Sequence, residues 1–138
     1  MFPTNTRFLV VDDFATMRKI IKKVLTELGY THFEEAGDGK RAFQMLQAAQ
    51  TSAQPFQFII SDWSMPEMNG LDLLKACKAD SNLKSLPFLL VLAESEEKNI
   101  VEAAKSGVSD CVVKPLNAEV LKGKLEKIWS KRQAPNAA

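Results

Sequence analysis

The sequence predicts an α/β protein in which a five-stranded parallel sheet is covered by five helices on its two faces. Short apolar segments alternate with amphipathic segments along the 138 residues, and this alternation is typical of a doubly wound parallel sheet. Charged side chains directly follow several of the apolar segments. In such sheets the functional site lies beyond the carboxyl ends of the strands, so these charges predict where it is.

The first half of the chain supplies three of the predicted strands and two of the helices. Residues 8–11 form an apolar strand, and apolar positions over 17–28 repeat at helical spacing. Residues 31–36 are short and partly polar, which favours an edge strand. Residues 42–49 have helical spacing, and residues 58–62 are apolar enough for a buried third strand.

The second half continues the same alternation. Residues 71–78 fit a helix, and residues 87–92 are the most continuously apolar segment, as expected for a central strand covered on both faces. A polar helix is expected over 96–106, a short fifth strand over 111–113 and a last amphipathic helix over 120–129.

Composition and length narrow the classes of protein that the chain can belong to. We expect a single domain over 1–138, with a core from about residue 7 to 129 and a frayed tail over 133–138. The net charge of +1 does not provide the strong positive potential that nucleic-acid-binding proteins usually have. No apolar run approaches the roughly 20 residues of a membrane span, and the amino terminus has no signal-peptide pattern. A cytoplasmic protein that does not insert into membranes is therefore expected, with Cys77 and Cys111 as free thiols.

Three carboxylates and one lysine are placed to share a pocket at the strand ends. Asp12 and Asp13 follow the first strand, Asp62 ends the third and Lys114 follows the fifth. Close carboxylates repel each other, and a divalent cation relieves that repulsion. Oxygen ligands without His or Cys favour Mg²⁺. A lysine suits a phosphoryl oxygen, and an aspartate in such a pocket can accept a phosphoryl group as an acyl phosphate.

Each of these residues alone has an ordinary explanation. An Asp at a strand end is usually a helix cap or a solvated loop residue, and a single lysine usually lies at the surface. His32, the one histidine, is expected to be an ordinary strand-start residue. Trp63, in the loop after Asp62, is expected to be half exposed. These ordinary explanations do not readily account for charged residues that occur together after successive strands.

Three motifs resemble the signatures of response-regulator receiver domains. They are FLVVDDF from Phe8, ISDWSMPEMNG from Ile60 and VVKP from Val112, and their order and spacing are those of the family. The resemblance is closest to the stand-alone CheY-type receivers of bacterial chemotaxis. It implies a flavodoxin-like fold with strand order 2-1-3-4-5 and a cis peptide bond between Lys114 and Pro115.

The resemblance also implies the chemistry of the pocket. Asp62 would accept a phosphoryl group from a histidine kinase of the CheA type, and Lys114 would contact that group. Asp13, Asp62 and the main-chain carbonyl of Ser64 would bind Mg²⁺ directly, and Asp12 would hold a metal-bound water. The chain is expected to be a monomer that catalyses its own phosphotransfer and autodephosphorylation without being a conventional enzyme.

The chain departs from the family at two positions that normally act together. Leu92 stands where the family usually has Ser or Thr, so the hydroxyl that would donate a hydrogen bond to the phosphoryl group is missing. Cys111 stands where these receivers usually carry an aromatic switch residue. Ser64 and Glu94 occupy positions that tune dephosphorylation in the family. Glu96-Glu97 replace basic residues and change the charge of the face used for the flagellar switch protein.

The resemblance also implies a surface for binding partners and more than one possible function. The residues of the expected partner surface are Trp63, Ile100, Cys111 and Lys124, and the candidate partners are the flagellar motor switch protein and a phosphatase. A phosphorylation-dependent chemotaxis protein that controls flagellar rotation is one function. A phosphate sink, or a receiver with another partner, is the alternative that Leu92 and Cys111 favour. An aspartate-nucleophile phosphatase generally needs an acid where Ser64 stands, and the segment 14–17 is a poor phosphate loop for a flavin module.

Overall fold

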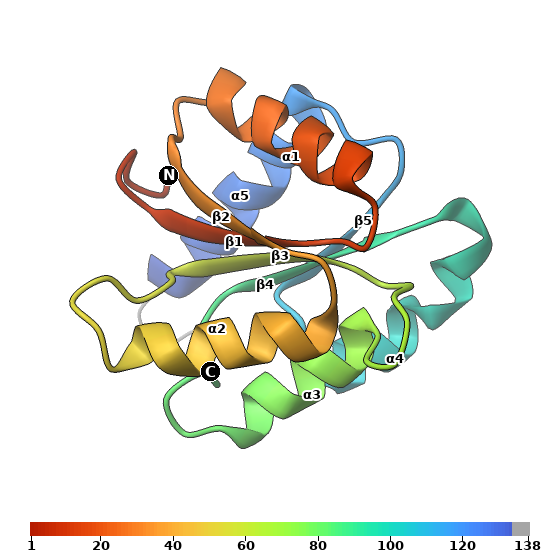
Figure 1. Ribbon diagram of the computed structural model, residues 1–138. Coiled ribbons are helices and arrows are strands. Elements are labelled where there is room, and N and C mark those ends of the chain that lie inside the picture. Colours follow the sequence, from red (N-terminus) through yellow and green to blue (C-terminus); the bar gives the residue numbers. More distant parts are fainter. Residues whose placement is uncertain (134–138) are drawn as a thin grey trace.

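The computed structural model describes residues 1–133, which fold into a parallel sheet between two layers of helices (Figure 1). The strands are β1 (Arg7–Val11), β2 (His32–Ala36), β3 (Phe58–Asp62), β4 (Phe88–Leu92) and β5 (Asp110–Val113). The helices are α1 (Ala15–Glu27), α2 (Gly39–Gln50), α3 (Gly70–Ala79), the 3-10 helix η1 (Glu94–Asn99), α4 (Ile100–Lys105) and α5 (Ala118–Gln133). Of the predicted tail over 133–138, Gln133 is still helical and the rest lies outside the described residues.

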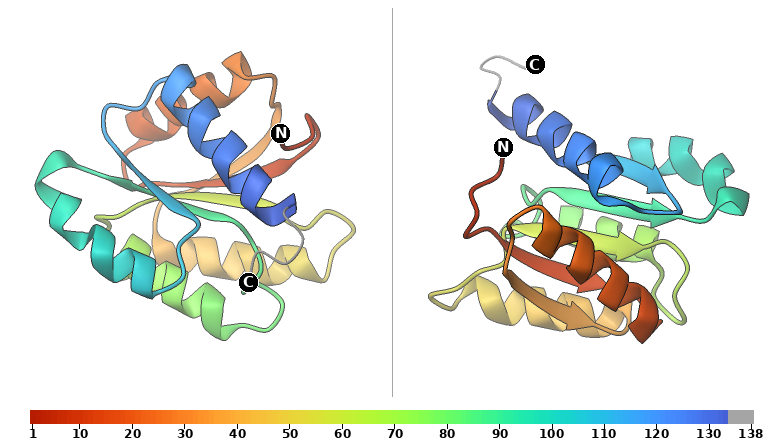
Figure 2. Two further views of the ribbon diagram at one scale, coloured as in Figure 1. Left: turned by 180° about the vertical axis from the view of Figure 1, so that it is seen from behind. Right: turned by 90° about the horizontal axis from the view of Figure 1, so that it is seen from above.

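The strand order is β2-β1-β3-β4-β5, and every neighbouring pair is parallel. This confirms the predicted doubly wound sheet, including its order and the edge position of β2. Helices α1 and α5 cover one face of the sheet, and α2, α3 and α4 cover the other (Figures 1 and 2). Among the described helices, none combines the length and apolarity needed to span a bilayer.

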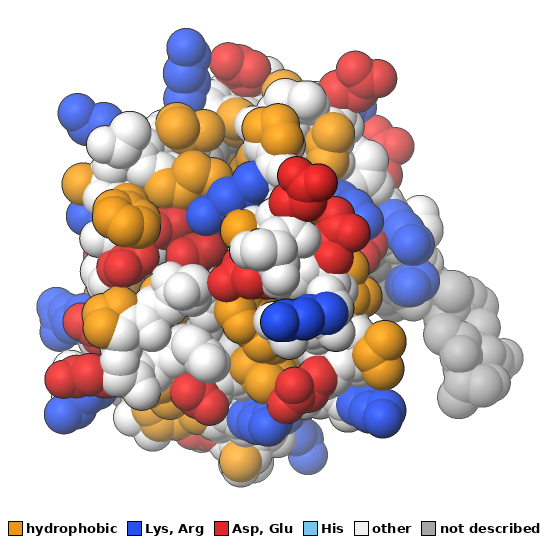
Figure 3. All heavy atoms as spheres, turned by 90° about the vertical axis from the view of Figure 1, so that its right-hand side faces the viewer, with side chains coloured by type: hydrophobic (Ala, Val, Ile, Leu, Met, Phe, Trp, Pro, Cys, Tyr) orange, Lys and Arg blue, Asp and Glu red, His pale blue; other side chains and the backbone are white. Residues whose placement is uncertain are grey.

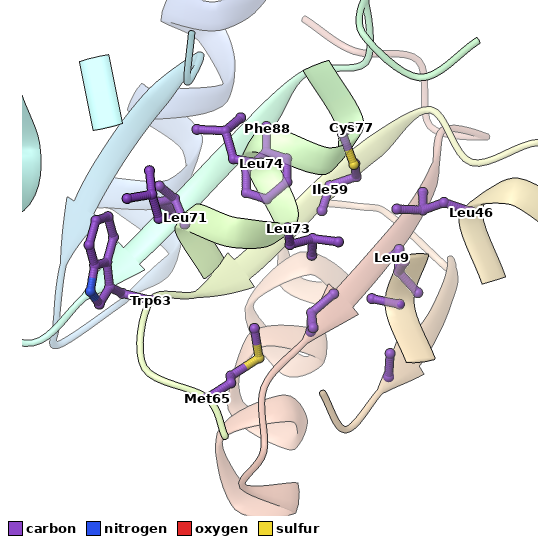
Figure 4. Packing of buried hydrophobic residues seen from close by; sticks show 14 of the residues in the cluster. Leu9, Leu46, Ile59, Trp63, Met65, Leu71, Leu73, Leu74, Cys77 and Phe88 are labelled. Atoms are coloured by element: carbon purple, nitrogen blue, oxygen red, sulfur yellow. The ribbon is translucent and has the colours of Figure 1, made fainter. Parts of the chain in front are cut away.

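Alternating side chains of the strands divide the core into two clusters, one on each face of the sheet. Leu9 and Ile59 belong to the cluster on the side of α2 and α3 (Figure 4), whereas Phe8 and Phe58 pack on the side of α1 and α5. All five residues of β4 are buried, as expected for a strand that is covered on both faces. The two clusters hold the strands in place, and the strand ends can therefore carry polar groups.

The segment after β4 differs from the single helix predicted over 96–106. It begins earlier, as a six-residue 3-10 helix that contains no buried residue, and only then continues as the short helix α4. Ala103 is the buried residue of α4. With so little apolar surface to pack against the sheet, this segment is held less firmly than the other helices.

Trp63 is buried, with 9% of its surface exposed, so the expectation of a half-exposed side chain was wrong. Its main-chain N–H donates to the Val91 carbonyl at 2.9 Å, which continues the pairing of β3 with β4 by one residue. Trp63 therefore lies on the same side of the strand as Ile59, and its ring joins the cluster that includes Leu71 (Figure 4).

Candidate functional site

The three predicted carboxylates meet at the carboxyl ends of β1 and β3. These strands are neighbours, with Val11 opposite Ser61, so the residues that follow them are brought side by side. Asp12, Asp13 and Asp62 each offer an oxygen atom, and these three atoms lie within 4.8 Å of one another. Figure 3 shows this end of the molecule, where acidic side chains gather around basic ones.

Each carboxylate keeps one buried oxygen atom without a hydrogen-bond partner among the described residues. These atoms are Asp12 Oδ2, Asp13 Oδ1 and Asp62 Oδ1. Lys114 Nζ lies 3.2 Å from Asp62 Oδ1, as an ion pair that lacks hydrogen-bond geometry. A buried carboxylate oxygen without a hydrogen bond is unfavourable, and three carboxylates so close together, with one lysine beside them, form the donor set that a hard divalent cation binds. The residues present therefore fit Mg²⁺.

The electrostatics of the site point the same way. Burial, and then the charge of Asp12, raise the pKa of Asp62 to about 6, although Lys114 lowers it. Burial also raises the pKa of Asp12 above its ordinary value. The pocket thus destabilises its own negative charges, and a bound cation would relieve that destabilisation.

Close packing of the main chain fixes the loop between β3 and α3. The Gly70 N–H donates to the Trp63 carbonyl at 2.8 Å. A Cβ atom at Gly70 would collide with the main-chain carbonyl oxygen of Asp62. Asn69 and Asp72 form a capping box that starts α3 at this point. The loop therefore packs against Asp62 and holds its main chain.

Two of the predicted switch and tuning positions lie in the apolar core, and two lie at the surface. Leu92 is completely buried at the end of β4, and Cys111 is 8% exposed on β5. Burial first, and then Asp110, raise the pKa of the Cys111 thiol to about 11. Ser64 and Glu94 are exposed. The Lys114–Pro115 bond is cis, as expected from the motif.

The four residues predicted as a partner surface differ in how accessible they are. Ile100 is 37% exposed, whereas Trp63 and Cys111 are buried. The ammonium group of Lys124 lies 3.3 Å from Asp110 Oδ1. In this conformation, only part of the predicted surface could touch a partner without a rearrangement.

Two charged residues near the site were missed by the sequence reasoning. Arg18 Nη1 donates to the main-chain carbonyl of Asp12 at 2.6 Å. Glu96, which the sequence placed on the face for a partner, accepts from the Ala93 N–H at 2.7 Å, and its charge helps to raise the pKa of Asp62. Ala93 has no side-chain oxygen, so the Ser/Thr-x-x-Glu signal of a capping box is absent from this segment. No local pattern indicates the contact of Arg18.

Comparison with known proteins identifies close relatives. The family model of the response regulator receiver domain matches residues 8–126. Chemotaxis protein CheY of Pseudomonas aeruginosa is 50% identical over 125 residues, which cover 91% of this chain and 97% of that protein. Chemotaxis protein CheY-3 of Vibrio cholerae is 46% identical over 127 residues, which cover 92% of this chain and 94% of that protein.

Solved structures share the fold. The structure of the chemotaxis response regulator CheY4 of Vibrio cholerae superposes with a TM-score of 0.78 at 33% identity, over 91% of this chain and 99% of that one. A response regulator receiver domain from Clostridium thermocellum gives a TM-score of 0.80 at 21% identity, over 93% of this chain and 97% of that one. The second likeness concerns the fold alone.

Proposed function

The chain belongs to the response regulator receiver domain family, and we propose that it is a signalling protein of a chemotaxis system that is switched by phosphorylation of Asp62. The observation that carries the proposal is the cluster of Asp12, Asp13 and Asp62. Each has a buried oxygen atom without a hydrogen-bond partner among the described residues, and Lys114 forms an ion pair with Asp62. The likeness to chemotaxis proteins supports a histidine kinase as phosphoryl donor and the cytoplasm as location.

In the proposed reaction, an Asp62 carboxylate oxygen attacks the phosphorus of a phosphohistidine. The new O–P bond forms as the N–P bond breaks, and the imidazole leaves with the electron pair. With a pKa of about 6, Asp62 is mostly ionised at neutral pH and can act as the nucleophile. Lys114, already 3.2 Å from Asp62, would contact a phosphoryl oxygen.

The metal site proposed with this reaction uses oxygen atoms only. Asp13, Asp62 and the main-chain carbonyl of Ser64 are the proposed direct ligands of Mg²⁺, and Asp12 is proposed to hold a metal-bound water. When bound, Mg²⁺ supplies positive charge that offsets the carboxylates and the transferred group. Asp12 and Asp62 are nearly completely buried, so little solvent competes for that charge.

Intact mass measurement tests the acceptor directly. With a small phosphodonor such as acetyl phosphate and Mg²⁺, wild type is expected to gain the mass of one phosphoryl group, and Asp62→Asn is expected to gain none. Asp38→Asn is a matched control, because it makes the same change at a half-buried helix cap that Asn also serves well. A wild type without any mass gain would contradict the proposal.

A second function is favoured by the interior of the pocket. Leu92 is fully buried and carries no hydroxyl, and Cys111 offers no ring that could move. Exposed Glu97 changes the charge of the neighbouring surface. We propose as the alternative that the chain takes up phosphoryl groups as a sink, or acts on a partner other than the flagellar motor switch protein. Strong phosphorylation-dependent binding to that switch protein would contradict the alternative.

Leu92→Thr is expected to raise the accumulation of acyl phosphate about tenfold over Leu92→Val. Thr and Val have nearly the same shape, so the pair isolates the hydroxyl from the lost apolar volume. A hydrogen bond to a charged group contributes about 1.5–3 kcal/mol, and about 1.4 kcal/mol corresponds to a factor of ten. The phosphorylated fraction of each variant, measured by intact mass under limiting acetyl phosphate, checks this. Equal fractions in the two variants would show that Leu92 does not limit phosphorylation.

A further inference from the structure

Three hydrogen bonds hold Asp12 at the end of β1. Its N–H donates to the Ala36 carbonyl of β2 at 3.2 Å. Its Oδ1 accepts from the Phe14 N–H at 2.9 Å, and its carbonyl accepts from Arg18 Nη1 at 2.6 Å. The remaining oxygen, Oδ2, is buried without a partner among the described residues. The residue is thus fixed at every polar atom except Oδ2, the one left for the proposed metal-bound water.

The side chain that holds the Asp12 carbonyl is itself fixed from the other side. Arg18 Nε donates to Glu35 Oε1 at 2.9 Å, and Lys22 Nζ lies 2.6 Å from Glu35 Oε2. Both cations lower the pKa of Glu35, with the Lys22 hydrogen bond as the largest cause. The Arg18 side chain is 19% exposed. The planar guanidinium of Arg18 therefore donates hydrogen bonds from two of its nitrogen atoms and links α1 to the end of β1 and to the edge strand β2.

We propose that Arg18 is a positioning residue of the cation site. The carbonyl of Asp12 and the N–H of Asp13 belong to one peptide unit, which is planar. A charge-assisted hydrogen bond on that carbonyl therefore sets the plane that joins the two residues, and with it the directions of both carboxylates. This inference rests on the proposed Mg²⁺ site and names a residue outside the ligand set on which the geometry of that site depends.

Because Arg18 is positively charged, the direction of the change in Mg²⁺ affinity on its removal tests the inference. A nearby cation repels Mg²⁺, so removing it would tighten metal binding if electrostatics alone were involved. Loss of positioning would weaken binding instead. Lys22 provides the comparison, because it pairs with the same carboxylate of Glu35 and sits one helical turn further along α1. Its hydrogen bond is to Glu35 and not to the peptide of Asp12.

The choice of cation separates positioning from a general loss of stability. Mg²⁺ demands nearly ideal octahedral geometry at about 2.0–2.1 Å, whereas Ca²⁺ tolerates irregular ligand sets at about 2.3–2.6 Å. Displaced carboxylates should therefore reduce Mg²⁺ affinity more than Ca²⁺ affinity. A weaker fold or a change in charge would shift the two affinities together.

The experiment is a titration of wild type, Arg18→Met and Lys22→Met with each ion, followed by tryptophan fluorescence, to which Trp63 contributes as the neighbour of Asp62. We expect Arg18→Met to bind Mg²⁺ about tenfold more weakly, with less than a threefold change for Ca²⁺. Lys22→Met is expected to keep the wild-type ratio of the two affinities. Without metal, exchange of the Phe14 N–H should be about tenfold faster in Arg18→Met than in Lys22→Met.

The outcomes separate this inference from the proposed function. Unchanged or tighter Mg²⁺ binding by Arg18→Met, or equal weakening for the two ions, would overturn the positioning role while the metal site stands. A wild type that binds neither ion would overturn the metal site itself. Arg18→Lys, which can restore one hydrogen bond but not two, is expected to recover part of the Mg²⁺ affinity.

Discussion

Replacing Asp62 with Asn is expected to stabilise the metal-free protein at pH 7 by about 3 kcal/mol. The carboxyl group of Asp62 is 3% exposed, and burial together with Asp12 raises its pKa from 3.8 to about 6. Each unit of pKa shift corresponds to about 1.4 kcal/mol, so ionised Asp62 costs the folded state about 3 kcal/mol relative to the unfolded chain. Asn removes the charge at nearly the same volume. Lys114 is 31% exposed and can be solvated when it loses its partner.

The pH dependence has a definite sign. Between the ordinary pKa of 3.8 and about 6, the folded protein holds more protons than the unfolded chain, so the free energy of unfolding of wild type falls as the pH rises. Above this window Asp62 is ionised in both states, and its contribution no longer changes. The advantage of Asp62→Asn should therefore grow from about pH 4 to about pH 6 and stay constant above. Asp12, whose pKa is also raised, acts in the same direction in both proteins.

Urea unfolding in the presence of a chelator, repeated across this pH range, measures the difference between wild type and Asp62→Asn. Added Mg²⁺ is expected to reduce the difference, because a cation that binds the folded state stabilises wild type increasingly as its concentration exceeds the Kd. Asp38→Asn, at a half-buried helix cap, serves as the control, because Asn caps a helix about as well as Asp does. Equal stabilities of Asp62→Asn and wild type at pH 7 without metal would contradict the electrostatic account of the site.

Much of the site could be predicted from the sequence because parallel strands bring their carboxyl ends to one edge. Asp12, Asp62 and Lys114 each follow a short apolar segment, and the topology alone then places them together. The position of β2 at an edge was likewise visible in its polar residues. These features depend on the order of segments and on the alternation of side chains, and both can be read locally.

The features that were missed depend on contacts between elements. Whether Trp63 turned inward depended on one further hydrogen bond to β4, which hydrophobic periodicity does not reveal. Arg18 and Lys22 follow each other by one turn of α1, and the sequence does not tell which of them reaches the end of β1. The sequence indicated Glu96 only as a charge on the face for a partner, whereas here its carboxylate accepts from the Ala93 N–H and caps the start of a 3-10 helix. Periodicity predicts which side of an element is buried, but not the partners of its polar groups.

Gly70→Ala is expected to destabilise the protein by about 3 kcal/mol, the upper end of the usual range for overpacking. The added Cβ would collide with the carbonyl oxygen of Asp62 and would lie 2.8 Å from Leu90 Cδ2. The φ angle of Gly70 lies outside the left-handed region, so collision and not conformational strain is the cause. One colliding atom belongs to the main chain of Asp62, so relief requires Asp62 or α3 to move. If Asp62 is the acceptor as proposed, phosphoryl uptake should slow as well.

Gly123→Ala provides the matched control for this prediction, because the same methyl group in α5 meets nothing within 4 Å. There it should stabilise the protein by about 0.5–1 kcal/mol, since Ala loses less conformational entropy than Gly in a helix. Urea unfolding at pH 7 is expected to place the two variants on opposite sides of wild type, with slow phosphoryl uptake only for Gly70→Ala. If Gly70→Ala were as stable and as reactive as wild type, the close contact between the loop and Asp62 would not be what positions the acceptor.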